Sequence, residues 1–132
     1  MDYRQSVFVA LVLAVVCALA SLPASAQVVS LKNGETAQLG TVYWVANCKS
    51  LLKSFAGVDV LEAPSGVSLS IKKDMVYARR QNCPEKVPGG IVMATAKGVK
   101  ASVSGALKYR VRYNTLDGPQ QSSHSVTINL YP

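Results

Sequence analysis

The side chains that could perform hydrolytic chemistry gather around the only histidine, His124. Ser122, Ser123 and Ser125 flank it, so a Ser-His-acid triad is the arrangement to consider. The sequence has no Gly-x-Ser-x-Gly turn to expose a serine, and neighbouring residues of a strand point to opposite faces. We therefore expect His124 to be an exposed loop or strand residue, and we predict no catalytic residues.

Carboxylates and metal ligands provide no second catalytic arrangement. Of the 7 acidic residues, the six other than Asp2 are scattered, and Asp59 and Glu62 are the closest pair. A glycosidase needs two carboxylates on either side of a sugar cleft, for which a chain of this size has little room. One histidine and two widely spaced cysteines cannot supply the ligands of a zinc site. We predict no enzyme activity, no metal and no cofactor.

Basic residues form the one pattern with a binding chemistry. Lys108, Arg110 and Arg112 alternate with apolar residues, so they should line one outward strand face at about 7 Å spacing. Arginine can hold a carboxylate or phosphate bidentately. Arg79 and Arg80 would extend the face if their strand belonged to the same sheet. We predict these five residues as a candidate anion-binding face; the alternative is a solvated face that discourages edge aggregation.

Two predicted strands at the end of the chain position this basic ladder, Lys108, Arg110 and Arg112. Apolar residues occupy every second position of 107–113, and a second alternation runs through 125–131. The two should pair antiparallel. Between them, Asp117-Gly118 favours a turn, and Pro119 cannot donate to a ladder. We expect a connection over 114–119 that is longer than a two-residue hairpin turn and mobile at its tip.

This closing pair resembles the last two strands of bacterial immunoglobulin-like and fibronectin-III-like domains. The resemblance implies a fold and no activity. The chain departs from the family pattern around its cysteines, because Trp44 precedes Cys48 closely and the hairpin tyrosines lie well beyond Cys83. The residues that carry the resemblance are Tyr109, Val111, Tyr113, Asp117, Gly118, Val126, Thr127, Ile128 and Leu130.

Residues 1–26 have the three parts of an export signal. Arg4 lies near the start, an apolar run extends over 7–20, and 24–26 reads Ala-Ser-Ala, a small-x-small cleavage site. The run is shorter than the roughly 20 residues that a membrane-spanning helix needs. We predict a signal peptide cleaved before Gln27, a periplasmic or secreted protein, and no stable membrane span after cleavage.

Residues 27–132 carry the whole positive charge and have the length of one domain. Without Arg4 and Asp2, 13 of the 14 basic and 6 of the 7 acidic residues remain, so the net charge stays +7. An exported basic protein is suited to an anionic envelope surface, an acidic polysaccharide or an acidic protein, and we expect no nucleic-acid partner. The alternative is a charge that only keeps the protein soluble.

Cys48 and Cys83 remain after the leader is removed, in a chain predicted to reach an oxidising compartment. We predict a disulfide between them. Closing a loop of about 36 residues should stabilise the fold by about 3 to 4 kcal/mol.

Turn residues separate several further short β segments, and no amphipathic helix is evident. We therefore predict an all-β fold, a single antiparallel immunoglobulin-like β-sandwich of about seven strands. We also expect Leu51, Leu52 and Phe55 to be buried. The segments are an edge strand at 27–32, a long strand at 36–46 bent at Gly40, a helical turn or loop at 49–55, strands at 57–61, 67–71 and 91–96, and a turn at 87–90.

Two functions fit these features. The first is a non-enzymatic binding or structural module of the bacterial envelope, whose basic face takes an anionic partner. The second is a small secreted inhibitor or effector that presents a loop, 84–90 or 114–123, to a protein target.

Overall fold

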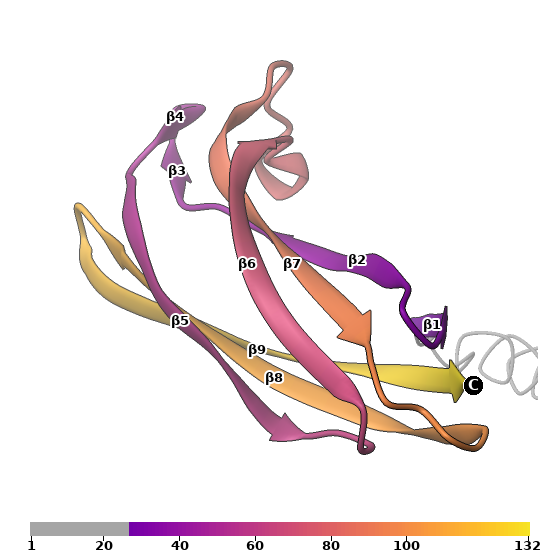
Figure 1. The fold of residues 1–132 in the computed structure, drawn as a ribbon. Helices are drawn as coiled ribbons and strands as arrows, with labels where there is room; N and C mark the ends of the chain where they lie inside the picture. Colours follow the sequence, from indigo (N-terminus) through magenta and orange to yellow (C-terminus); the bar gives the residue numbers. More distant parts are fainter. Residues whose placement is uncertain (1–26) are drawn as a thin grey trace, which may run out of the picture.

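The computed structural model describes residues 27–132, and the predicted signal peptide, 1–26, lies outside the described residues. Within 27–132 the fold is all-β, with nine strands and one 3₁₀ turn, which confirms the predicted class (Figure 1). No helix in this range is long and apolar enough to cross a membrane. The elements are β1 (Val28–Lys32), β2 (Thr36–Val42), β3 (Val45–Ala46), β4 (Lys49–Ser50), β5 (Leu52–Glu62), β6 (Val67–Val76), η1 (Arg79–Gln81), β7 (Val87–Ala96), β8 (Val103–Thr115) and β9 (Gly118–Tyr131).

The strands form two larger sheets and one small hairpin. One sheet has the order β1-β9-β8-β5, the other has the order β2-β7-β6, and β3 pairs with β4. Figure 1 shows the two larger sheets as separate layers. β1 runs parallel to β9, whereas the other pairs are antiparallel, so the prediction of a wholly antiparallel fold was wrong at β1. The strand number exceeds the predicted seven partly because β3 and β4 are only two residues each.

A single main core lies between the two larger sheets. On β8, Leu107 and Val111 are fully buried, and they alternate with outward-facing residues as the sequence pattern predicts. β9 adds Ile128 and Leu130 to the same cluster, and β7 adds small residues such as Ala94 from the opposite sheet. Because both layers contribute buried residues to one cluster, removal of this apolar surface from water holds the layers together.

The segment 49–55 is extended, not a helical turn or loop. It contains β4 and the start of β5, which pairs with β8 over its whole length. The register shifts three times along this pair, and such irregularities break the two-residue alternation that marks a strand in sequence. Leu51, Leu52 and Phe55 are half-buried, whereas we expected them to be buried.

Gly89 and Gly90 lie inside β7, where the sequence suggested a turn. A Cβ atom on Gly90 would collide with the Phe55 ring, and one on Gly89 would lie 2.6 Å from the Val42 carbonyl oxygen. The two glycines therefore let neighbouring groups approach the β7 backbone closely. Their role is packing rather than chain reversal.

The β8–β9 connection is a two-residue turn, Leu116-Asp117, because Thr115 pairs with Gly118. The expected longer connection was wrong, and Pro119 belongs to β9. Thr115 Oγ1 donates to the Gly118 carbonyl oxygen at 2.8 Å and accepts from the Asp117 N–H at 3.1 Å. Trp44 Nε1 also donates to Asp117 Oδ2 at 2.8 Å, which ties the turn to the connection between β2 and β3.

The predicted long strand at 36–46 is divided. β2 ends at Val42, and Trp44 lies half-buried in the connection to β3. The pairing with β7 shifts between Gln38 and Gly40, which agrees with the predicted bend at Gly40.

Candidate functional site

The basic ladder lies on the outward face of β8, and acidic residues of β5 pair with each of its members. Lys108 Nζ is 3.3 Å from Glu62 Oε2, and Arg110 Nη2 is 3.4 Å from Asp59 Oδ2. Arg112 Nε donates to the same Asp59 oxygen at 2.8 Å. The cause is the register of the pair, because β5 places Asp59 opposite Arg110 and Glu62 opposite Lys108.

Asp59 is strongly engaged by the two arginines. The hydrogen bond from Arg112 lowers the pKa of the Asp59 carboxyl below its ordinary value, and the positive charges of Arg112 and Arg110 act in the same direction. The same hydrogen bond raises the pKa of Arg112. An external anion would have to compete with Asp59 and Glu62 for these cations.

Arg79 and Arg80 do not extend the ladder. They belong to η1, which follows β6 of the other sheet. None of the ion pairs found in residues 27–132 involves either arginine. The five basic residues of the predicted face therefore divide into a paired group on β8 and a second group on η1.

A disulfide and a small apolar cluster hold η1 in place. Cys83 follows η1 and is bonded to Cys48 of the β3–β4 turn, with their Cα atoms 5.5 Å apart, which confirms the predicted disulfide. Ala78, Cys83 and Val87 form a buried cluster against Tyr43. We call the region formed by Tyr43, Tyr77, Arg79, Arg80 and Lys86 the η1 corner.

Cations and aromatic rings are paired in the η1 corner. The Arg80 guanidinium lies 5.9 Å from the centre of the Tyr43 ring, and Lys86 Nζ lies 5.4 Å from the centre of the Tyr77 ring. The Arg80 backbone N–H also donates to Tyr43 Oη at 3.2 Å. A ring does not neutralise a cation as a carboxylate does, so the guanidinium of Arg80 keeps its capacity to bind an anion.

A pocket of about 330 Å³ opens between the η1 corner and the inner faces of β2, β8 and β9. Arg79, Arg80, Tyr109 and His124 are among the residues that line it. The Tyr109 and His124 rings lie 5.2 Å apart between centres, and His124 Nε2 is 3.0 Å from Ser122 Oγ. Polar and aromatic groups thus converge on a space large enough for a small ligand.

His124 is half-buried, contrary to our expectation of an exposed residue. It shares the inward face of β9 with Val126 and Ile128, because all three have the same parity along the strand. That parity was visible in the sequence and could have placed His124 on the inward face. No metal-ligating cluster exists in residues 27–132, and no carboxylate hydrogen bonds to the His124 ring in that range.

Burial and charge alter titration in the pocket. Burial lowers the pKa of His124 below its ordinary value, and the positive charge of Arg80 lowers it further. Burial also raises the pKa of Tyr109. Near neutral pH the histidine is therefore uncharged, and the arginines supply the positive charge of the pocket.

The two loops considered for a protein target are shorter than predicted. β7 begins at Val87, so 84–90 contains only three residues before the strand. All of 114–123 except Leu116 and Asp117 belongs to β8 or β9.

Comparison with known proteins identifies no family. The chain matches no protein-family model, and no curated protein or solved structure shows detectable similarity to it.

Proposed function

We propose that the protein is an exported, non-enzymatic binding module of the bacterial envelope, periplasmic or secreted, which takes an anionic partner at the η1 corner. The export signal predicted in 1–26 supports the location. The disulfide between Cys48 and Cys83 also favours an oxidising compartment.

We propose an immunoglobulin-like sandwich as the scaffold. The order β2-β7-β6 in one sheet and β9-β8-β5 in the other corresponds to strands B-E-D and G-F-C of that fold. β1 differs from the constant-type arrangement because it pairs with the last strand. The resemblance of the closing hairpin supports the same assignment.

The observation that carries the binding proposal is the contrast between the two groups of basic residues. Asp59 and Glu62 form ion pairs with the basic residues of β8, whereas Arg79 and Arg80 are not ion-paired to any described residue. Arg79 and Arg80 also line a pocket, where a carboxylate, phosphate or sulfate would be partly removed from water. Electrostatic attraction is stronger in such a place than on an open strand face.

Retention on immobilised heparin tests the proposal. The full-length chain is expressed with export, and the purified protein is bound to immobilised heparin and eluted with increasing salt. The variant Arg79→Gln/Arg80→Gln should elute at much lower salt than the parent protein. The matched control Arg110→Gln/Arg112→Gln removes the same charge from the ladder and should elute much closer to the parent.

Equal losses in the two double variants would show that net charge alone causes retention and would refute a specific site. Unchanged retention of the η1 variant would also refute it. Crosslinking in the native envelope provides a second outcome. If one protein is captured at high salt and the parent protein does not bind heparin, the partner is a protein and not an anionic surface.

A further inference from the structure

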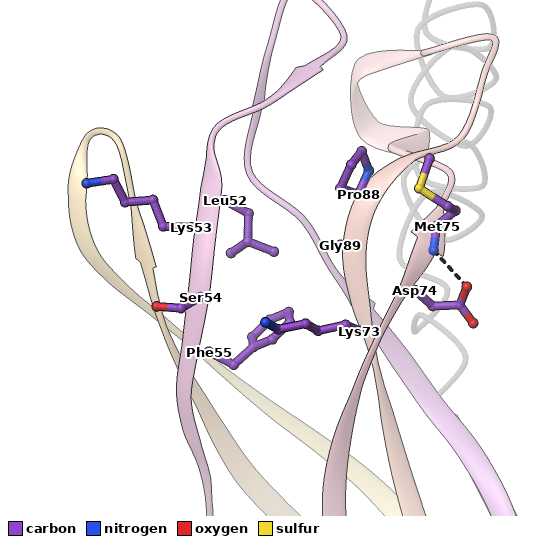
Figure 2. A pocket seen from close by; sticks show the side chains of 9 residues that line it. All are labelled: Leu52, Lys53, Ser54, Phe55, Lys73, Asp74, Met75, Pro88 and Gly89. Atoms are coloured by element: carbon purple, nitrogen blue, oxygen red, sulfur yellow. Dashed lines mark hydrogen bonds between the residues drawn. The ribbon is translucent and has the colours of Figure 1, made fainter.

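A second pocket, of about 360 Å³, lies on the side of the molecule where β5 and β6 are the edge strands. Residues of β5, β6 and β7 line it, and none of them lines the pocket at the η1 corner (Figure 2). The two pockets are therefore separate sites.

Apolar groups form most of the wall. Leu52 and Phe55 come from β5, Met75 from β6 and Pro88 from β7. Because Gly90 has no side chain, the Phe55 ring can lie against the β7 backbone. Met75 is 47% exposed. This apolar wall is thus open to solvent, and an apolar ligand would shield it.

Lys73 adds one positive charge to the apolar wall. It has the same parity as the inward-facing Leu69 and Ile71 of β6, and Figure 2 shows its side chain reaching toward Phe55. No ion pair in the described part of the chain involves Lys73. An unpaired ammonium group beside apolar side chains matches a ligand that is anionic at one end and apolar elsewhere.

The other polar groups around the pocket are turned away or already engaged. Lys53 and Ser54 extend away from the space between β5 and β6 in Figure 2. Asp74 Oδ1 accepts from the Met75 N–H at 2.7 Å, and its Oδ2 lies 3.9 Å from Lys72 Nζ. Lys73 is therefore the cation placed to hold a ligand head group.

The edge of β5 is poorly suited to an added peptide strand. Its pairing with β8 contains three register shifts, and bulges of this kind interrupt the regular backbone groups that strand addition needs. The pocket also has the size of a small-molecule site. Both observations favour a compact ligand over an extended acidic peptide.

We propose that this pocket binds a small single-chain amphiphile with one anionic head group, the chemistry shared by a free alkyl carboxylate and by an anionic lipid. The alkyl chain lies against Leu52, Phe55 and Met75, and Lys73 pairs with the head group. A chain buried in this way should gain about fourfold in affinity for each methylene removed from water.

A chain-length series of alkanoates tests the site by isothermal titration calorimetry on the exported protein, below the concentration at which each ligand forms micelles. Affinity should rise from hexanoate to octanoate to decanoate at up to about fourfold per methylene. It should then level off once the pocket is filled. No dependence on chain length would overturn the proposal.

Variants of β6 separate the head-group contact from the apolar contact. Lys73→Gln should weaken octanoate binding by up to about fivefold and leave 1-octanol binding unchanged, as expected for the loss of one exposed ion pair. The matched control Lys72→Gln changes a neighbouring lysine whose side chain is 71% exposed, and it should leave both affinities unchanged. Met75→Gln should reduce the gain per methylene. Equal effects of Lys72→Gln and Lys73→Gln would contradict the assignment.

Further arms identify the source of the ligand and test another role for Lys73. Alkanoate binding without binding to anionic phospholipid vesicles supports a free amphiphile; binding to both supports a lipid chain as source. Binding of acidic peptides but not of alkanoates would refute the site.

Lys73 could instead only protect the sheet edge from pairing with another molecule. If Lys73→Gln self-associates and binds alkanoates as the parent protein does, Lys73 has that role and the proposal fails. Arg79→Gln/Arg80→Gln should bind alkanoates normally, which distinguishes this site from the η1 corner.

Discussion

The contact between Phe55 and Gly90 provides the sharpest test of the packing between the two sheets. In Gly90→Ala the new Cβ would overlap the Phe55 ring, whose Cε2 and Cε1 atoms lie 2.8 and 3.1 Å from the Cβ position. Either the ring or β7 must move. Overpacking of this kind costs about 1 to 3 kcal/mol, more than the roughly 0.5 to 1 kcal/mol that alanine gains over glycine in chain entropy.

The expected result is a net loss of roughly 0.5 to 2 kcal/mol in the free energy of unfolding. Urea unfolding followed by tryptophan fluorescence measures it, since Trp44 is the only tryptophan. In the control Gly40→Ala, the new Cβ meets only Tyr109 Oη at 3.6 Å, an ordinary contact, so we expect little change or a small gain in stability.

A double variant identifies the clash as the cause. Adding Phe55→Leu to Gly90→Ala should recover part of the loss, because the smaller side chain no longer covers residue 90, and the two changes should be non-additive. If Gly90→Ala is as stable as the parent protein, or if the two changes add independently, the ring does not lie on β7 as described.

Three further results are expected from buried groups. His124→Gln should flatten the pH dependence of the free energy of unfolding. The pKa of His124 is lowered in the folded protein, so the stability that its uncharged ring contributes is complete above the ordinary pKa of 6.5 and is lost as pH falls through the lowered pKa. Urea unfolding between about pH 7.5 and about pH 5 measures this, and an unchanged slope would contradict the burial of His124. Replacing Cys48 and Cys83 together by alanine should lower the free energy of unfolding by about 3 to 4 kcal/mol, measured against the oxidised parent protein; a loss near zero would show that the bond does not constrain the unfolded chain. Leu107→Ala, at a fully buried core position, should cost about 2 to 5 kcal/mol in the same measurement, and an effect as small as that of a surface substitution would contradict its place in the core.

Elements with a clear local period could be predicted from the sequence. The alternation in 107–113 and 125–131 marks strands with one buried face, and β8 and β9 contain these segments. The segment 91–96 is apolar on both faces and short, which favours a central strand, and β7 lies in the middle of its sheet. The disulfide was predicted from the two cysteines that remain after a predicted export signal.

Elements that depend on a distant partner could not be predicted. The start of β5 has no alternation, since its register with β8 shifts, and the pairing of Leu52 with Thr115 crosses much of the chain. Gly89-Gly90 is typical of a turn in sequence, but in the structure Gly90 lies in a strand because the Phe55 ring packs against it. Asp117-Gly118 indicates a turn, but the length of that turn depends on which residues of β8 and β9 face each other.

Strand alternation is enough to predict which residues share a face, and it places Lys108, Arg110 and Arg112 on the outward face of β8. No local pattern reveals that Asp59 and Glu62 form ion pairs with this ladder, or that Arg79 and Arg80 lie beside a pocket instead. The difference arises because the strand period is a local property with a spacing of two residues. Which strand lies alongside, and in what register, depends on packing between segments that are far apart in the chain.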